Sequence, residues 1–230
     1  MTASDTGIDL SLKLARRRDP DLLMEFSRFA ADLNVARLCW NGEPVVVNRA
    51  PQIHIGRVSV SLPPECFLQP SKQGEKVLQQ LTKAAGEPAR RIADLFCGCG
   101  SFSFVLAEHA SVAAFDSSAV QIEALRDAAR SAAGKVRAET RDLFRQPLSP
   151  TELDCFDAVV LDPPRIGAMA QVRNLAGSAV PSVLYISCNP ASFARDARIL
   201  VDGGYRVKRV VPVDQFLWSP HVEVFAHFTR

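Results

Sequence analysis

The sequence predicts an α/β protein with a mostly parallel sheet of seven strands, whose last strand is antiparallel, and a small α+β element in front of it. From residue 91 onward, short apolar runs alternate with helical patterns, which is typical of βαβ units and a parallel sheet. The connection over 214–220 is too short for a crossover helix, so the final strand is expected to run antiparallel. Residues 1–64 lack this alternation and are assigned to the α+β element.

Composition indicates an ordinary globular protein. The chain has 230 residues, of which 47% are hydrophobic and 23% charged, and its formal net charge is +2. That charge is too small to indicate a polyanion partner, so binding of RNA or DNA has to be argued from a site. Six cysteines occur without metal-binding spacing, which favours reduced thiols, no metal and a cytoplasmic protein. No signal-peptide pattern and no apolar run of about 20 residues occurs, so no membrane association is expected.

The N-terminal element, residues 1–64, has mixed patterns. Period-2 and period-3.6 spacing predict a strand, a helix opened by Asp19 and Pro20, a hairpin and a second strand, in that order, at 8–14, 19–33, 37–47 and 54–62. The first strand has no evident partner. This region is therefore interpreted as the remnant of a longer N-terminal part.

Residues 65–230 form the predicted main domain. Its helices are expected at 71–85, 101–110, 118–133, 168–179 and 191–202. Its strands are expected at 91–97, 111–116, 135–141, 156–161, 181–187, 205–213 and 222–228. Seven strands with an antiparallel last strand are the architecture of the Rossmann-like class I S-adenosylmethionine-dependent methyltransferases.

Cys188 follows an apolar strand and precedes Asn189 and Pro190, the residue types that favour a helix N-cap and first turn. The positive end of that helix is predicted to lower the cysteine pKa below its usual value of about 8.5. Cys188 is thus a candidate nucleophile. A small buried core cysteine is the alternative.

The first βα junction contains a Gly-Cys-Gly turn. Gly98 and Gly100 permit a tight turn and close approach of a ligand, and Asp116, about twenty positions later, can accept hydrogen bonds from ribose hydroxyls. Ser103 stands where the dinucleotide fingerprint has its third glycine, which argues against NAD. Asp142, after the third strand, is where this architecture places an adenine contact. A plain tight turn and a solvated loop aspartate are the alternatives.

Two further candidates follow buried strands. Asp162, with Pro163 and Pro164 behind it, forms a rigid lip where α/β sheets bind ligands; it can bind an N–H of a base, and Arg165 a phosphate or carbonyl. Glu223 begins the antiparallel last strand, so topology brings it to the same edge. Its apolar neighbours predict a raised pKa and a role as general base. The structural alternatives are a strand-terminating turn at Asp162 and a salt-bridged edge glutamate at Glu223.

Taken in series, these motifs resemble those of the RNA uracil-5 methyltransferases, which form 5-methyluridine in transfer or ribosomal RNA. The resemblance rests on Phe67-Leu-Gln69, Asp94-Leu-Phe-Cys-Gly-Cys-Gly100, Asp162-Pro-Pro-Arg165, Ser187-Cys-Asn-Pro190 with Ala194-Arg-Asp196, and His221-Val-Glu223. It implies S-adenosyl-L-methionine as cofactor, RNA as partner, and Cys188, Glu223 and Asp162 as catalytic residues. It further implies a cofactor and uridine site lined by Gln69, Phe96, Gly98, Gly100, Ser101, Asp116, Asp142 and Asp162.

The chemistry of that family accounts for these residue types. A thiolate from Cys188 would add to carbon 6 of uracil and make carbon 5 nucleophilic, and Glu223 would remove the carbon 5 proton after methyl transfer. The uridine would have to leave its stack. The RNA and the oligomeric state stay open, although a monomer is expected.

Two departures from the family pattern bear on this interpretation. Ser71 stands where members usually have asparagine, and no counterpart of an N-terminal RNA-binding barrel or iron–sulfur cysteine cluster occurs. One alternative function is a methyltransferase acting on an exocyclic amine of adenine or guanine, which does not require Cys188. A second is a truncated cofactor-binding or RNA-binding module without turnover.

Overall fold

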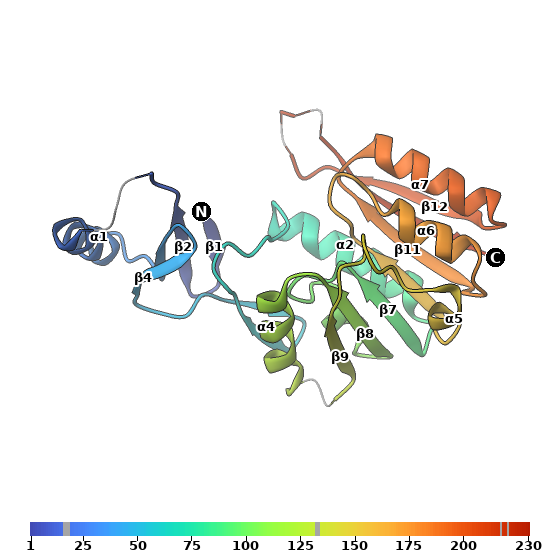
Figure 1. The fold of residues 1–230 in the computed structure, drawn as a ribbon, viewed down its shortest axis with the longest axis horizontal. Helices are drawn as coiled ribbons and strands as arrows, with labels where there is room; N and C mark the ends of the chain where they lie inside the picture. The colour runs from blue at the N-terminus through green and yellow to red at the C-terminus, as the bar shows by residue number, and fades with distance from the viewer. Residues whose placement is uncertain (16–18, 132–133, 217, 220) are drawn as a thin grey trace. The chain divides into compact units, whose positions relative to one another are not determined.

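The computed structural model describes residues 1–15, 19–131, 134–216, 218–219 and 221–230 (Figure 1). The chain forms two compact units, Met1–Leu68 and Gln69–Arg230. All six cysteines are free thiols. In the part of the chain that is described, no helix is both long and apolar enough to cross a membrane.

The smaller unit holds a four-stranded sheet, one helix and a separate hairpin. The sheet has the order β1-β2-β3-β4, with strands at Thr2–Ser4, Gly7–Leu12, Arg37–Trp40 and Glu43–Val47. Helix α1 (Pro20–Asp32) begins as predicted, because the side chain of Asp19 accepts a 2.8 Å hydrogen bond from the backbone N–H of Leu22. The predicted hairpin is confirmed by the antiparallel pairing of β3 and β4.

Two expectations for this unit were wrong. The single strand expected at 54–62 is a hairpin, β5 (Gln52–Ile55) and β6 (Val58–Ser61), because Gly56 takes a φ of +59° and reverses the chain. The strand near the N-terminus, β2, does have partners: β1 pairs with it antiparallel and β3 parallel. A short strand of three polar and small residues such as β1 leaves little periodic signal in a sequence.

The larger unit contains the seven-stranded sheet that the sequence predicted. Its order is β12-β13-β11-β10-β7-β8-β9, with strands at Arg91–Leu95 (β7), Ser111–Asp116 (β8), Val136–Thr140 (β9), Ala158–Leu161 (β10), Ser182–Ser187 (β11), Arg206–Val213 (β12) and Glu223–Thr229 (β13). β13 is antiparallel to both of its neighbours, β11 and β12, which confirms the prediction for the last strand.

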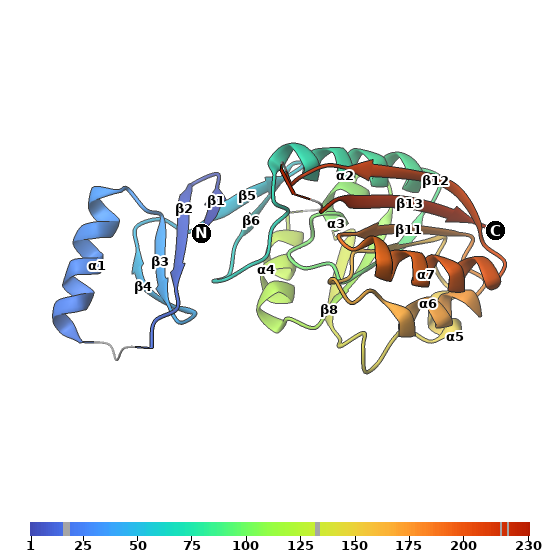
Figure 2. The same cartoon turned by 90° about the horizontal axis from the view of Figure 1, so that it is seen from above.

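Helices cover both faces of this sheet. They are α2 (Lys72–Gly86), α3 (Ser103–Leu106), α4 (Ala119–Ala129), α5 (Pro150–Leu153), α6 (Met169–Ala176) and α7 (Pro190–Asp202). Figure 2 shows α2 on one side of the strands and α6 and α7 on the other. The helix predicted at 101–110 is reduced to α3, because turns follow Gly100, and α5 was not predicted. Residues 132–133 of the predicted 118–133 helix, and 217 and 220 of the β12–β13 connection, lie outside the described residues.

The central strands explain the apolar runs of the sequence. All four residues of β10 and five of the six in β11 are buried, as expected for strands covered on both faces. Tyr185, Tyr205 and Phe228 are among the largest fully buried side chains of this core. Each contributes about 1.5–3 kcal/mol through apolar burial. The polar residues that follow these strands therefore extend from a rigid platform.

Candidate active site

Cys188 and Glu223 are brought together by strand pairing. β11 ends at Ser187 and β13 begins at Glu223, and the antiparallel register places Ser187 opposite Val224. Cys188 therefore lies one residue beyond the paired region, next to the first residue of β13. Burial of the thiol, and then the negative charge of Glu223 close to it, raise the pKa of Cys188.

Asp162 completes the group from the neighbouring strand. β10 and β11 pair in parallel with Leu161 opposite Tyr185, so Asp162 emerges from the sheet at the same edge as Cys188. Its backbone N–H donates to the carbonyl of Leu95 at 3.2 Å. Burial, followed by the charge of Glu223, raises the pKa of the Asp162 carboxyl well above its usual range. The three predicted catalytic residues are therefore neighbours at the carboxyl edge.

The predicted direction of the Cys188 pKa was wrong. Asn189 does cap α7, since its Oδ1 accepts a 3.1 Å hydrogen bond from the N–H of Ala191, so the helix terminus lies where it was expected. Burial of the thiol, and then the charges of Glu223 and Asp162, nevertheless raise the pKa of Cys188. Desolvation and two nearby carboxylates outweigh the half charge of a helix terminus.

Glu223 has the environment that the sequence indicated. It is buried, and burial raises the pKa of its carboxyl above the ordinary value. A carboxylate with a raised pKa is a stronger base than an exposed one, so Glu223 is suited to accept a proton from a bound substrate.

The glycine turn and Asp116 form one unit. The Asp116 carboxylate accepts hydrogen bonds from the N–H of Gly98 at 3.0 Å and of Ser118 at 2.8 Å. Gly98 and Gly100 take φ values of +55° and +94°, and a Cβ on Gly100 would lie 2.9 Å from the ring of Phe104. The left-handed backbone favours glycine at both positions, packing excludes a side chain at Gly100, and Asp116 braces the turn that the cofactor prediction depends on.

Asp94, in β7, has a buried carboxyl group that its sequence pattern did not predict. Its side chain is fully buried, and Ser103 donates a 2.5 Å hydrogen bond to Oδ2. Among the described residues, no group hydrogen-bonds to Oδ1. Burial raises the pKa of this carboxyl to about 7. A buried oxygen without a partner can accept from a ligand ammonium or N–H group.

Asp142 and Phe96 follow β9 and β7, the two strands that flank β8 in the sheet. Oδ1 of Asp142 accepts from the N–H of Phe144 at 3.0 Å, and the Phe144 ring packs against Phe96 with centroids 5.4 Å apart. Phe96 takes a left-handed φ of +62°, which is strained for an aromatic residue. Ser101 contributes its carbonyl, which accepts from the side chain of Gln79 at 3.1 Å.

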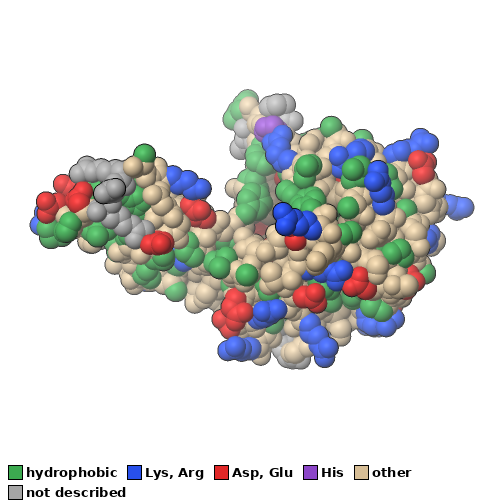
Figure 3. All heavy atoms as spheres, viewed as in Figure 1, with side chains coloured by type: hydrophobic (Ala, Val, Ile, Leu, Met, Phe, Trp, Pro, Cys, Tyr) green, Lys and Arg blue, Asp and Glu red, His purple; other side chains and the backbone are tan. Residues whose placement is uncertain are grey.

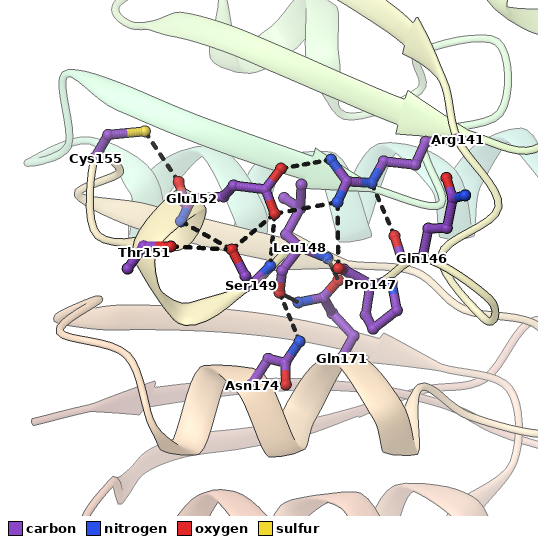
Figure 4. Close-up of polar contacts among 10 residues, drawn as sticks. All are labelled: Arg141, Gln146, Pro147, Leu148, Ser149, Thr151, Glu152, Cys155, Gln171 and Asn174. Atoms are coloured by element: carbon purple, nitrogen blue, oxygen red, sulfur yellow. Dashed lines mark hydrogen bonds and ion pairs between the residues drawn. The ribbon is translucent and has the colours of Figure 1, made fainter.

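Arg141 fixes the chain on which Asp142 lies. Its guanidinium donates to both carboxylate oxygens of Glu152, at 2.7 and 3.1 Å, and to the carbonyls of Gln146 at 2.8 Å and Pro147 at 3.3 Å (Figure 4). These hydrogen bonds hold the pKa of Glu152 down at about 2. The loop after β9 is therefore closed by one side chain, which the sequence did not predict.

Gln69 is held by a residue far along the chain. Gln215, in the β12–β13 connection, is buried and donates through Nε2 to Oε1 of Gln69 at 3.0 Å. Ser71 caps α2 by accepting from the N–H of Gly74 at 3.0 Å, and its hydroxyl donates to Oε1 of Gln215 at 3.4 Å. A Cβ on Gly74 would lie 2.3 Å from the Gln215 side chain. Ser71 thus has a structural role in this chain.

Asp196 supports the lip that follows Asp162 and was not assigned a role from the sequence. It is fully buried, and its Oδ2 accepts from the N–H of Ala168 and from the hydroxyl of Tyr185, both at 2.7 Å. Arg195 donates to Oδ1 at 2.8 Å and to the carbonyl of Ile166 at 2.9 Å. The usable signal was an acidic residue on the inner face of an amphipathic helix.

Within the described residues, no group of three or more His, Cys, Asp or Glu side chains has the arrangement of a metal site.

The sequence comparisons all match this chain to RNA methyltransferases. A family model described as tRNA (uracil-5-)-methyltransferase matches residues 111–230. A Caulobacter vibrioides protein named as an RNA methyltransferase is 44% identical over 236 residues, covering 100% of this chain and 57% of the relative. A 23S rRNA (uracil(1939)-C(5))-methyltransferase of Chromohalobacter salexigens is 43% identical over 142 residues, covering 61% of this chain and 29% of the relative. The chain thus spans little more than half the length of relatives that match all of it.

Comparison of structure gives the same fold. The tRNA (uracil-54, C5)-methyltransferase of Pyrococcus abyssi, solved with S-adenosyl-L-homocysteine, superposes with a TM-score of 0.75 and 24% identity, covering 96% of this chain and 55% of that protein. The Rossmann-like methyltransferase sheet predicted from the sequence is therefore confirmed.

Proposed function

The chain belongs to the tRNA (uracil-5-)-methyltransferase family, and from this we propose that it transfers a methyl group from S-adenosyl-L-methionine to carbon 5 of a uridine in RNA. The observation that carries the proposal is the meeting of Cys188, Glu223 and Asp162 at one edge of the sheet. A thiol, a basic carboxylate and a base-binding carboxylate are the groups that this reaction needs.

The residues around the glycine turn fit the proposed cofactor. S-adenosyl-L-methionine carries a sulfonium and an ammonium group, and the buried Asp94 offers an oxygen without a partner among the described residues. Asp116 and Asp142 lie at the ends of β8 and β9, where ribose and adenine would bind. When bound, the cofactor supplies the methyl group as an electrophile.

Cys188 is proposed as the nucleophile. Its thiolate forms a bond to carbon 6 of uracil, the ring electrons move onto the carbonyl oxygen, and the resulting enolate makes carbon 5 nucleophilic. The charge of Arg165 lowers the pKa of Cys188 and opposes the two carboxylates. Asp162 is positioned to accept a hydrogen bond from the base edge and so to orient the ring.

Glu223 is proposed as the base of the second half-reaction. After carbon 5 has been methylated, Glu223 takes the remaining proton from that carbon, the carbon 5–carbon 6 double bond reforms, and the thiolate of Cys188 leaves. Its buried position favours this role, because desolvation raises its pKa.

The substrate is proposed to be a uridine in ribosomal or transfer RNA that is unpaired or flipped out of its stack. Relatives named for either RNA support this class: the Chromohalobacter salexigens protein for 23S rRNA and the Pyrococcus abyssi protein for tRNA. A residue buried at a sheet edge cannot reach carbon 6 of a stacked base, so flipping is needed at a cost of a few kcal/mol. A free thiol nucleophile suits the reducing cytoplasm.

The proposal is tested with RNA that contains 5-fluorouridine. Fluorine cannot leave as a proton, so the protein, S-adenosyl-L-methionine and this RNA should give a methylated covalent adduct at Cys188, seen by denaturing gel and mass spectrometry. Cys188→Ala should give no adduct. Glu223→Gln should accumulate the adduct on ordinary uridine as well, because its step follows methylation. Separate preparations of rRNA and tRNA identify the substrate class.

Methyl transfer that survives in Cys188→Ala would contradict the proposal and favour methylation of a base amine, which needs no thiol. Cofactor binding without transfer to any RNA would favour a binding module.

A further inference from the structure

The connection between β12 and β13, which leads into Glu223, carries an exposed tryptophan. Trp218 is fully exposed, and its φ is +64°, a left-handed conformation that is strained for a bulky side chain. An exposed indole usually lies at a binding surface, since its burial against a partner releases a large apolar area. Trp218 is the aromatic residue at which full exposure and a left-handed backbone coincide among the described residues, which points to a functional position.

The two ends of this connection fix where Trp218 can lie. Glu223 follows five residues later, so the two Cα atoms are at most about 18 Å apart. Gln215 precedes Trp218 by three residues and is anchored on Gln69 by a 3.0 Å hydrogen bond. Phe216 and His221 pack edge to face, 5.9 Å between ring centroids, at the base of the loop. Trp218 therefore lies on a connection that is anchored on Gln69 before it and leads directly into Glu223 after it.

The surroundings match a nucleic-acid strand. Two exposed residues on the loop after β10, Arg165 and Ile166, lie at the same edge of the sheet. The positive charge of Arg165 lowers the pKa of Cys188. Figure 3 shows the β12–β13 connection projecting from the larger unit, with basic and hydrophobic side chains next to it. Cations for phosphates and an aromatic plane for a base are the two components of single-strand binding surfaces.

We propose that Trp218 stacks on an unpaired base next to the target uridine and holds the strand at the mouth of the site. The proposal rests on the RNA substrate inferred above and adds a residue and a binding mode. Trp218 is a positioning residue: it binds RNA and takes no part in bond making.

The two tryptophans of the chain make a direct test possible. Trp40 is fully buried in the smaller unit, whereas Trp218 is fully exposed, so a ligand that stacks on Trp218 quenches the solvent-exposed part of the emission. Addition of single-stranded oligouridylate should quench the wild-type protein and leave the emission of Trp218→Ala unchanged. Phe retains an aromatic plane, so Trp218→Phe should keep most of the affinity.

Loss of the stack sets the expected size of the effect. Trp218→Ala should bind the oligouridylate about 5- to 150-fold more weakly, the range for one base stacked on an aromatic side chain. The slope of log affinity against log salt should not change, since an indole neutralises no phosphate. In methylation assays the KM for RNA should rise while kcat at saturating RNA is kept. Val201→Ala, an exposed apolar residue near the far end of α7, is the control and should behave as wild type.

The outcomes separate this inference from the proposed function. Unquenched emission and unchanged affinity in Trp218→Ala would overturn the role of Trp218, even if uridine is methylated. Quenching and weaker binding would uphold it as an RNA contact, even if Cys188 formed no adduct and the methylation proposal failed. A fall in kcat with an unchanged KM would also overturn it, because it would place Trp218 in the chemical step.

Discussion

At the scale of single residues, the raised pKa of Cys188 has a measurable consequence. Glu223 is the largest charge contribution to that rise, so Glu223→Gln should lower the pKa of Cys188. We expect alkylation of Cys188 by iodoacetamide near neutral pH to become about 3- to 10-fold faster, the effect of half to one pKa unit on the thiolate population. The measurement is peptide mass spectrometry over a time course at several pH values.

Cys155 is the internal control for that experiment. It is exposed on the turn after α5, where its thiol donates to the carbonyl of Glu152, so its alkylation rate should be equal in the two proteins. An unchanged rate at Cys188 would mean that the Glu223 charge does not reach the thiol.

The same residue shows what sequence reasoning can and cannot supply. The helix start behind Cys188 could be predicted because Asn189 and Pro190 are local signals. The direction of the pKa shift could not, since it depends on burial of the thiol and on the charges of Glu223 and Asp162, which are 35 and 26 positions away along the chain. Likewise, only the fold shows that Asp94 keeps one carboxylate oxygen without a partner among the described residues.

At the scale of elements, the loop after β9 depends on Arg141. Arg141→Met removes four hydrogen bonds that close this loop, and the half-exposed Glu152 makes their net contribution about 1 kcal/mol. We expect cofactor affinity to fall about fivefold, because Asp142 loses its fixed backbone. Isothermal titration with S-adenosyl-L-homocysteine measures the change.

Arg130→Ala is the matched control, since Arg130 is an exposed arginine whose ion pair, among the described residues, is the local one with Asp127. The pH dependence gives a second check. Glu152 has a depressed pKa, so its contribution is present above its ordinary pKa and is lost as the pH falls toward 2. Equal affinities in Arg141→Met and wild type would show that the loop is held by other contacts.

Elements were predictable where their period was long and regular. The seven strands of the larger unit and its longer helices follow directly from apolar spacing, whereas α5, one turn long, has too few residues for a period. In α1, Ala30 is buried and Phe26 packs partly against the same apolar cluster, whereas Phe29 on the same helix is exposed. Periodicity defines a face and does not say how far the partner surface extends.

At the scale of the whole molecule, the division of the chain into two compact units predicts that a ligand stabilises one unit against heat and leaves the other unchanged. The proposed cofactor residues all lie within Gln69–Arg230, so S-adenosyl-L-homocysteine should stabilise that unit alone. At 100 times its dissociation constant the stabilisation is about 2.7 kcal/mol. In scanning calorimetry we expect one transition to move upward and the other to stay.

Trp40 assigns the transitions. It is buried in the smaller unit, so the change in its emission during heating follows Met1–Leu68, and the midpoint should not depend on the ligand. A ligand-dependent midpoint at Trp40 would mean that the two units unfold as one.

Long-range contacts marked the limit of prediction at this scale. The contact of Gln215 with Gln69 joins residues 146 positions apart, and neither residue carries a local pattern that points to the other. The motifs at the ends of the strands could be brought together beforehand because strand order follows from the βαβ repeat and its final reversal.

The pairing of β11 with β13 makes the position of Glu223 relative to Cys188 independent of the connection that precedes β13. The register that sets Ser187 opposite Val224 comes from the pairing of β11 with β13, so we expect changes of length between Gln215 and β13 to leave Glu223 next to Cys188. Under the proposed function, variation in that segment would alter the contact with RNA while the bond-making groups stay in register.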